Sequence, residues 1–211
     1  MPNWDIENEF QGNVCGVDEA GRGPWVGPVV AGAVIFLSRD INSELLYGIN
    51  DSKKLSAKKR EKLYDLLLVE ERAGHITYGI GEASAAEIDE LNILQATFLA
   101  MKRAVQKLKV VPTQALIDGN RLPADFICPC SCYIGGDARS YSIAAASILA
   151  KVYRDNLLKN LAQKYPGYGF EKNAGYGTKD HIEALEKYGV TPEHRKSYRP
   201  IKEILEANAS L

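Results

Sequence analysis

Residues 14–24 read VCGVDEAGRGP, an apolar run that ends in two adjacent carboxylates, Asp18 and Glu19, and leads into a Gly-Arg-Gly-Pro turn. Neighbouring side chains on a strand point to opposite faces, so the two carboxylates share one site only if the strand ends at Asp18 and the backbone turns through the glycines. Acidic residues at a strand end, beside a glycine-rich loop that carries a cation, suit a hard metal ion facing a phosphate. The Asp-Glu pair alone is more typical of a solvated turn, but the attached turn sequence and two further carboxylates favour the metal site.

Those two further carboxylates also follow strand-like runs. Asp118 ends the apolar run of residues 115–118 and precedes a glycine, and Asp137 follows Gly136. If the strands are neighbours, their ends bring four carboxylates into a small volume, where repulsion raises their pKa values unless a cation neutralises them. Oxygen-only ligands favour Mg²⁺ or Mn²⁺ over zinc or copper, and two such ions can stabilise the attacking and leaving oxygens of a phosphoryl displacement. The pattern therefore predicts metal-dependent phosphodiester hydrolysis.

The periodicity of apolar residues predicts a layered α/β core followed by helices. Strands are expected at residues 14–18, 29–36, 75–80, 115–118 and 126–134, the first two as a hairpin, and helices at 56–72, 92–108, 140–163 and 178–188, with another starting at Thr191-Pro192. A Tyr-Pro-Gly turn begins at Tyr165. We therefore expect a core over residues 1–165 and a helical C-terminal region over 166–211 that packs on it as part of one domain.

The charge distribution allows nucleic-acid binding only where basic residues gather. The formal net charge is −1, so the chain as a whole is not a polycation. Residues 51–62 hold six Lys or Arg against two acids, and residues 187–202 hold five against one. Either run is also compatible with a solvated helix face.

The chain shows no sign of export or membrane insertion. The longest apolar run, residues 29–37, is too short for a membrane-spanning helix, and the N-terminus lacks a signal-peptide pattern. We therefore expect a cytoplasmic protein with four reduced cysteines. Cys128, Cys130 and Cys132 alternate, which predicts buried thiols on one face of a strand rather than the paired spacing of a zinc site.

The three histidines, His75, His181 and His194, do not adjoin a motif serine or cysteine in the sequence. A Ser-His-Asp or Cys-His mechanism is therefore unsupported, although contacts made only in the fold stay open. We expect all three to be surface or helix-capping residues.

Seven ordered motifs resemble those of ribonuclease HII, the bacterial type 2 ribonuclease H. They are GVDEAGRGP (16–24), DSKKLS (51–56), IDELNIL (88–94), IDGNR (117–121), GD (136–137), IAAASILAKV (143–152) and GYGT (175–178). The resemblance spans nearly the full chain and implies a ribonuclease H-like mixed five-stranded sheet flanked by helices. It also implies an endoribonuclease that hydrolyses the RNA strand of RNA–DNA hybrids. Such an enzyme incises 5′ of single ribonucleotides embedded in duplex DNA, leaving a 3′-hydroxyl and a 5′-phosphate.

The resemblance gives roles to the four carboxylates. It implies that Asp18, Glu19 and Asp118 are the principal ligands of Mn²⁺ or Mg²⁺, in a site that takes two ions. Asp137 completes the site and helps to position water.

A second set of residues is expected to select RNA, which requires a contact with the 2′-hydroxyl. Glycine allows close backbone approach, Arg22 can bind a phosphate bidentately, and Tyr176 offers a ring and a hydroxyl between two glycines. The resemblance implies that Gly21, Arg22, Gly23 and Tyr176 read the junction between RNA and DNA.

Further substrate contacts are expected from basic and polar residues. The resemblance matches Lys53 to a lysine that contacts phosphate. Ser147, Lys151 and Arg154 recur at helical spacing, which is compatible with a polar face toward a nucleic-acid strand and equally with a packed or solvated helix face. The chain departs from the family at residues 173–174, where Asn-Ala replaces the usual His-Lys and leaves one backbone contact in doubt.

Two other functions stay open. A type 3 ribonuclease H has a substantial N-terminal domain and a different junction loop, whereas 13 residues precede the first strand here and the Gly-Arg-Gly sequence is intact. A non-catalytic hybrid-binding module would be favoured by loss of a metal carboxylate, and none is lost. We expect a monomer that acts on RNA–DNA hybrids and ribonucleotide-containing duplexes, with no membrane partner.

Overall fold

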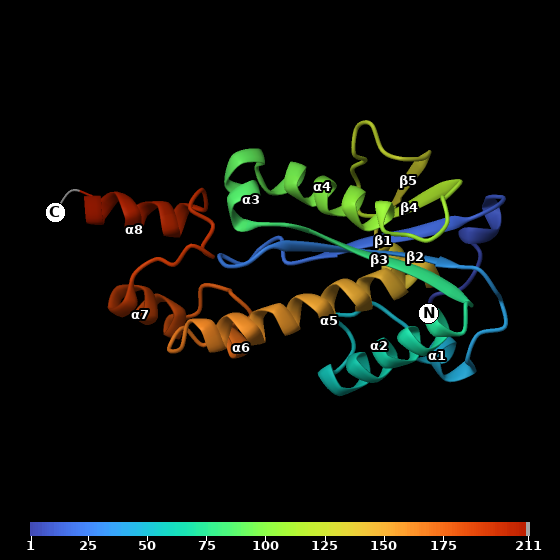
Figure 1. The fold of residues 1–211 in the computed structure, drawn as a ribbon, viewed down its shortest axis with the longest axis horizontal. Helices are drawn as coiled ribbons and strands as arrows, with labels where there is room; N and C mark the ends of the chain where they lie inside the picture. Colours follow the sequence, from blue (N-terminus) through green and yellow to red (C-terminus); the bar gives the residue numbers. More distant parts are fainter. Residues whose placement is uncertain (210–211) are drawn as a thin grey trace.

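A mixed sheet with helices on both faces forms the core (Figure 1). The structure, a computed structural model, describes residues 1–209, with side chains as far as residue 207. The strands are β1 (Val14–Ala20), β2 (Val29–Phe36), β3 (Ile76–Ala83), β4 (Gln114–Asp118) and β5 (Cys130–Tyr133). Their order is β3-β2-β1-β4-β5; β1 pairs antiparallel with β2 and parallel with β4. The expected five-stranded mixed sheet and its first hairpin are confirmed.

The helices follow local capping signals in the sequence. They are α1 (Ser43–Gly48), α2 (Ala57–Arg72), α3 (Ala85–Leu91), α4 (Ile93–Gln106), α5 (Tyr141–Lys164), α6 (Phe170–Asn173), α7 (Lys179–Tyr188) and α8 (Arg199–Ala209), with short 3-10 helices η1 (Glu7–Glu9) and η2 (Gly136–Ala138). The side chains of Ser56, Asn92, Ser140 and Thr178 cap α2, α4, α5 and α7 by accepting backbone N–H groups. No helix in the described part of the chain is long and apolar enough to cross a membrane.

Glycines let a helix lie directly on each face of the sheet. A Cβ at Gly16 would lie 2.1 Å from the backbone of α5, and one at Gly81 would lie 2.1 Å from a carbonyl oxygen of α4. Gly32 and Gly79 make the same approach to α5 and α4. The two helices therefore sandwich the sheet, and α5 runs close beneath β1, the strand that carries Asp18.

The helical C-terminal region lies beyond the end of the sheet that carries the β1–β2 loop (Figure 1). Its apolar cluster includes Phe170 and Leu185, together with Val26 of the loop and Leu158 of α5. Because this cluster draws on both parts of the chain, we propose that they fold as one domain. Residues 210 and 211 of the expected C-terminal region lie outside the described residues.

Two local expectations are wrong because tertiary pairing overrides the sequence signal. β1 does not end at Asp18 but continues to Ala20, since it pairs with β2 along this whole length. No helix begins at Thr191-Pro192; α8 begins at Arg199, and the preceding segment instead forms a bridge between Val26 and His194.

The expectation of buried thiols on the fifth strand is also wrong. β5 lies at the edge of the sheet and pairs with β4 alone. Cys132 is exposed, and Cys128 and Cys130 are half-buried.

We expect Gly16→Ala to lower the free energy of unfolding by about 2 kcal/mol, because the backbone of α5 cannot retreat from a new Cβ without moving the helix. Urea unfolding followed by circular dichroism measures this change. Gly48→Ala is the matched control, since the nearest atoms to its Cβ would belong to the end of the Leu63 side chain rather than to backbone. Equal losses in both variants would contradict the role of the close approach.

Candidate active site

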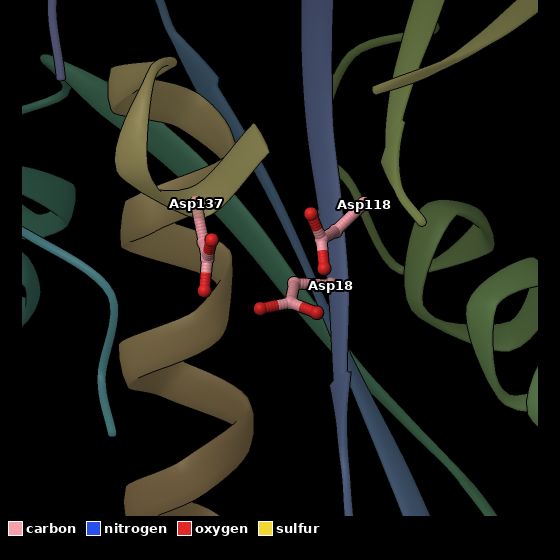
Figure 2. A group of neighbouring side chains, drawn as sticks. All are labelled: Asp18, Asp118 and Asp137. Atoms are coloured by element: carbon pink, nitrogen blue, oxygen red, sulfur yellow. The ribbon is translucent and has the colours of Figure 1, made fainter. Parts of the chain in front are cut away.

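The fold brings three of the four predicted carboxylates together. Val17 of β1 pairs with Ile117 of β4, so Asp18 and Asp118 are the next residues of two parallel neighbours. The short helix η2 adds Asp137. One carboxylate oxygen from each aspartate lies within 4.8 Å of the others, and the three side chains converge in Figure 2.

Glu19 approaches this cluster from another side. Because β1 continues past Asp18, Glu19 points to the opposite face of the strand, and it is not one of the three clustered carboxylates. Its Oε1 lies 3.5 Å from Nη1 of Arg22. One cavity of about 320 Å³ is lined by Glu19, Arg22 and Asp118. Asp118 therefore lies between Glu19 on one side and the other two aspartates on the other.

The cluster is electrostatically strained. Burial holds the pKa of Asp18 well above its ordinary value, and the charges of Glu19 and Asp118 add to this effect. Burial and the charge of Asp118 also raise the pKa of Asp137 to about 6. The Glu19 backbone N–H donates to Asp18 Oδ1 at 2.6 Å, and that of Gly136 donates to Asp118 Oδ1 at 2.7 Å. A divalent cation fits this all-oxygen donor set, because it would neutralise charges that the fold forces together.

Lys53 lies beside the carboxylates, as the sequence predicts for a site residue. Burial opposes its charge, but Asp18, Asp51 and the other nearby carboxylates outweigh burial and raise its pKa. Asp51 is a site residue that sequence reasoning missed, although it stands in the same motif. It accepts the backbone N–H of Lys53 at 2.9 Å and forms a side-chain hydrogen bond with Asp137.

The three polar residues predicted on α5 differ in placement. Ser147 is buried, and its Oγ accepts the backbone N–H of Ser52 at 3.1 Å, which ties α5 to the Lys53 turn. Lys151 is partly exposed and pairs with Asp155. Arg154 does not belong to a polar outer face: it is buried and donates to backbone carbonyls, among them Val26 O.

The structure also brings the predicted junction-reading residues together. The Tyr176 ring lies 3.4 Å from the position of a Cβ on Gly23, and it is 53% exposed. Gly21 has a φ of +94°, a conformation that favours glycine. The loop Gly21–Gly23 and Tyr176 therefore form one exposed surface, defined here as the junction surface.

The expectation that all histidines are surface or capping residues is wrong for His181 and His194, which are buried in contact with each other. The backbone N–H of Thr191 donates to His194 Nδ1 at 3.0 Å, so the proton of His194 is on Nε2. That N–H donates to His181 Nε2 at 3.1 Å, which leaves His181 Nδ1 to donate to the Tyr176 carbonyl at 2.9 Å. Burial lowers both histidine pKa values, that of His194 to about 4, so the neutral pair supports Tyr176 at pH 7.

Comparisons with known proteins find a matching family model, similar sequences and similar solved structures. The ribonuclease HII family model matches residues 15–201. A ribonuclease HII of Rhodospirillum rubrum is 52% identical over 209 residues, covering 99% of this chain and 94% of the relative. Among solved structures, ribonuclease H2 from Pyrococcus horikoshii OT3 has a TM-score of 0.75 at 28% identity, covering 95% of this chain and 100% of that one. The PCNA:RNase HII complex from Archaeoglobus fulgidus gives a TM-score of 0.70 at 25% identity, with 89% and 96% covered.

We expect Asp137→Asn to stabilise the metal-free protein at pH 7. The folded-state pKa of Asp137, about 6, lies above the ordinary value of 3.8, so its contribution to stability is present at low pH and is lost as pH rises through 6. Removing the charge should raise the free energy of unfolding at pH 7 by on the order of 2 kcal/mol. Urea unfolding in EDTA at pH 7 and pH 4 measures the effect. A gain of the same size at pH 4, where Asp137 is already neutral, would contradict this explanation.

Proposed function

Because this chain belongs to the ribonuclease HII family, we propose that its three-aspartate cluster is the catalytic centre of a ribonuclease H that hydrolyses the RNA strand of RNA–DNA hybrids. The observation that carries the proposal is the convergence of Asp18 of β1, Asp118 at the end of the neighbouring strand β4, and Asp137 of η2. The finer activity we propose is incision 5′ of a single ribonucleotide embedded in duplex DNA, leaving a 3′-hydroxyl and a 5′-phosphate. Membership of the ribonuclease HII family favours a type 2 over a type 3 ribonuclease H. The presence of all four carboxylates disfavours a hybrid-binding module without catalytic activity.

We assign the carboxylates to a Mg²⁺ or Mn²⁺ site. Asp18 and Asp118 would hold the ion from the two strands, with Glu19 approaching from the opposite face of β1. When bound, one or two such ions would activate water and stabilise the oxygens of the phosphodiester that is displaced. Asp137 would help to position the attacking water, and Asp51 would orient Asp137 through their hydrogen bond.

The surrounding residues would bind the substrate. Lys53, Arg22 and Lys151 are the cations we assign to phosphates, because they lie partly exposed around the carboxylates or on α5. Ser147 acts indirectly, since it holds the turn that carries Lys53. The junction surface would read the ribose of the nucleotide at the RNA–DNA boundary.

We propose that the protein acts as a monomer on RNA–DNA hybrids and ribonucleotide-containing duplexes. We assign it to the cytoplasm, in keeping with a nucleic-acid substrate and with four free thiols.

Asp118→Asn tests the catalytic assignment. The substitution keeps the shape of the side chain but removes a charge from the cluster, so we expect cleavage to fall by about 100-fold or more, since a metal ion supplies several kcal/mol of transition-state stabilisation. Cleavage of an RNA–DNA hybrid and of a duplex with one ribonucleotide is measured at saturating Mg²⁺.

The control for this experiment is Asp125→Asn, at an exposed aspartate outside the cluster, which should cleave both substrates at the normal rate. Circular dichroism checks that each variant is folded. Near-normal cleavage by folded Asp118→Asn would show that the cluster is not the catalytic centre.

A further inference from the structure

Arg195 lies fully buried beneath the β1–β2 loop and binds its backbone. Its Nη2 donates to the Gly21 carbonyl at 2.5 Å, its Nη1 to the Arg22 carbonyl at 2.8 Å and its Nε to the Gly27 carbonyl at 3.0 Å. The Tyr198 hydroxyl accepts from Arg195 Nη1 at 2.9 Å and donates to the same Arg22 carbonyl at 2.5 Å. Two side chains of the C-terminal region thus fix the carbonyls of Gly21 and Arg22 in the loop Gly21–Gly23, called the junction loop below.

Fixing these carbonyls also fixes the direction of the next two N–H groups. A trans peptide is planar, and its N–H points away from its C=O. Because the carbonyls of Gly21 and Arg22 point at Arg195, the N–H groups of Arg22 and Gly23 point away from the guanidinium. Neither N–H finds a hydrogen-bond acceptor among the described residues. Two adjacent donors are therefore free, and the second lies beside the exposed ring of Tyr176.

We propose that Arg195 and Tyr198 are positioning residues that hold the Arg22 and Gly23 N–H groups ready for a ribose hydroxyl, and so set the preference for a single embedded ribonucleotide. This inference rests on the proposed junction-reading function. Only arginine offers a rigid fork of donors, which is why one side chain can hold three carbonyls. A lysine at position 195 would keep the charge but could not hold the same three groups.

A second buried arginine shows that the contact is specific. Arg154 is as buried as Arg195, but it donates to the carbonyls of Val26, Pro28 and Ala174 and to neither central carbonyl of the junction loop. Arg154 packs against Gly21, but the hydrogen bonds that orient the two free N–H groups come from Arg195 and Tyr198.

Tyr198→Phe is the main test, because it keeps the ring and removes only the hydroxyl that binds Arg22 O. We measure kcat and KM on a duplex with one ribonucleotide and on an RNA–DNA hybrid of equal length. The ratio of the two kcat/KM values should fall about fivefold against the single ribonucleotide, the change expected for one lost hydrogen bond. Tyr168→Phe is the matched control: its hydroxyl donates to the Gly189 carbonyl at 2.7 Å, away from the junction loop, so the ratio should stay unchanged.

Two further variants separate the positioning role from junction reading itself. Arg195→Lys should shift the ratio in the same direction by more than Tyr198→Phe, and if it fails to fold, Tyr198→Phe still decides. Tyr176→Ala is the benchmark for junction reading itself. A shifted ratio in Tyr176→Ala with an unchanged ratio in Tyr198→Phe would overturn the positioning role alone. An unchanged ratio in both would overturn junction reading as well, whereas the catalytic assignment is tested separately by Asp118→Asn.

Discussion

Mutual repulsion among clustered carboxylates is the constraint on which the site depends. Asp18, Asp118 and Asp137 would separate if their backbones were free to move, and the fold prevents this in three ways. The parallel pairing of β1 with β4 sets two of them side by side. The close approach of α5 at Gly16 keeps the start of this helix, and with it η2, against the sheet. The Gly136 N–H then holds Asp118 directly. The fold thus holds carboxylates together despite their repulsion, and the resulting site favours a divalent cation.

The C-terminal region supports the other half of the site. Two arginines lie fully buried near the base of the β1–β2 loop, and backbone carbonyls supply most of their hydrogen bonds. Burial lowers the pKa of Arg154 to about 10, so its guanidinium stays charged at neutral pH. The neutral pair of His181 and His194 holds the Tyr176 carbonyl from the same region. The conformation of the loop that would contact nucleic acid is therefore fixed by these buried arginines and histidines, before any substrate binds.

Local signals were sufficient to predict much of this arrangement. The apolar runs that precede Asp18 and Asp118 pointed to these two carboxylates, and capping side chains indicated the starts of α2 and α4. The position of Glu19 could not be read in this way, because its face of the strand depends on how far β1 pairs with β2. The burial of Arg195 was equally hidden, since it follows from a contact between chain segments about 170 residues apart. Charge and polarity suggested a solvated face there, and only the packed fold shows that backbone carbonyls satisfy this cation.

The most direct test of the account is the number of protons released when Mg²⁺ binds at pH 6. Calorimetric titration in two buffers with different ionisation enthalpies measures it. The account predicts proton release, because Asp137 has a pKa of about 6 and that of Asp18 is also raised, while a bound cation would lower both pKa values and favour the ionised carboxylates. The release should fall in Asp137→Asn. Mg²⁺ binding to the wild-type protein without proton release would contradict the account, because the carboxylates would then be ionised already and the fold would not hold them under strain.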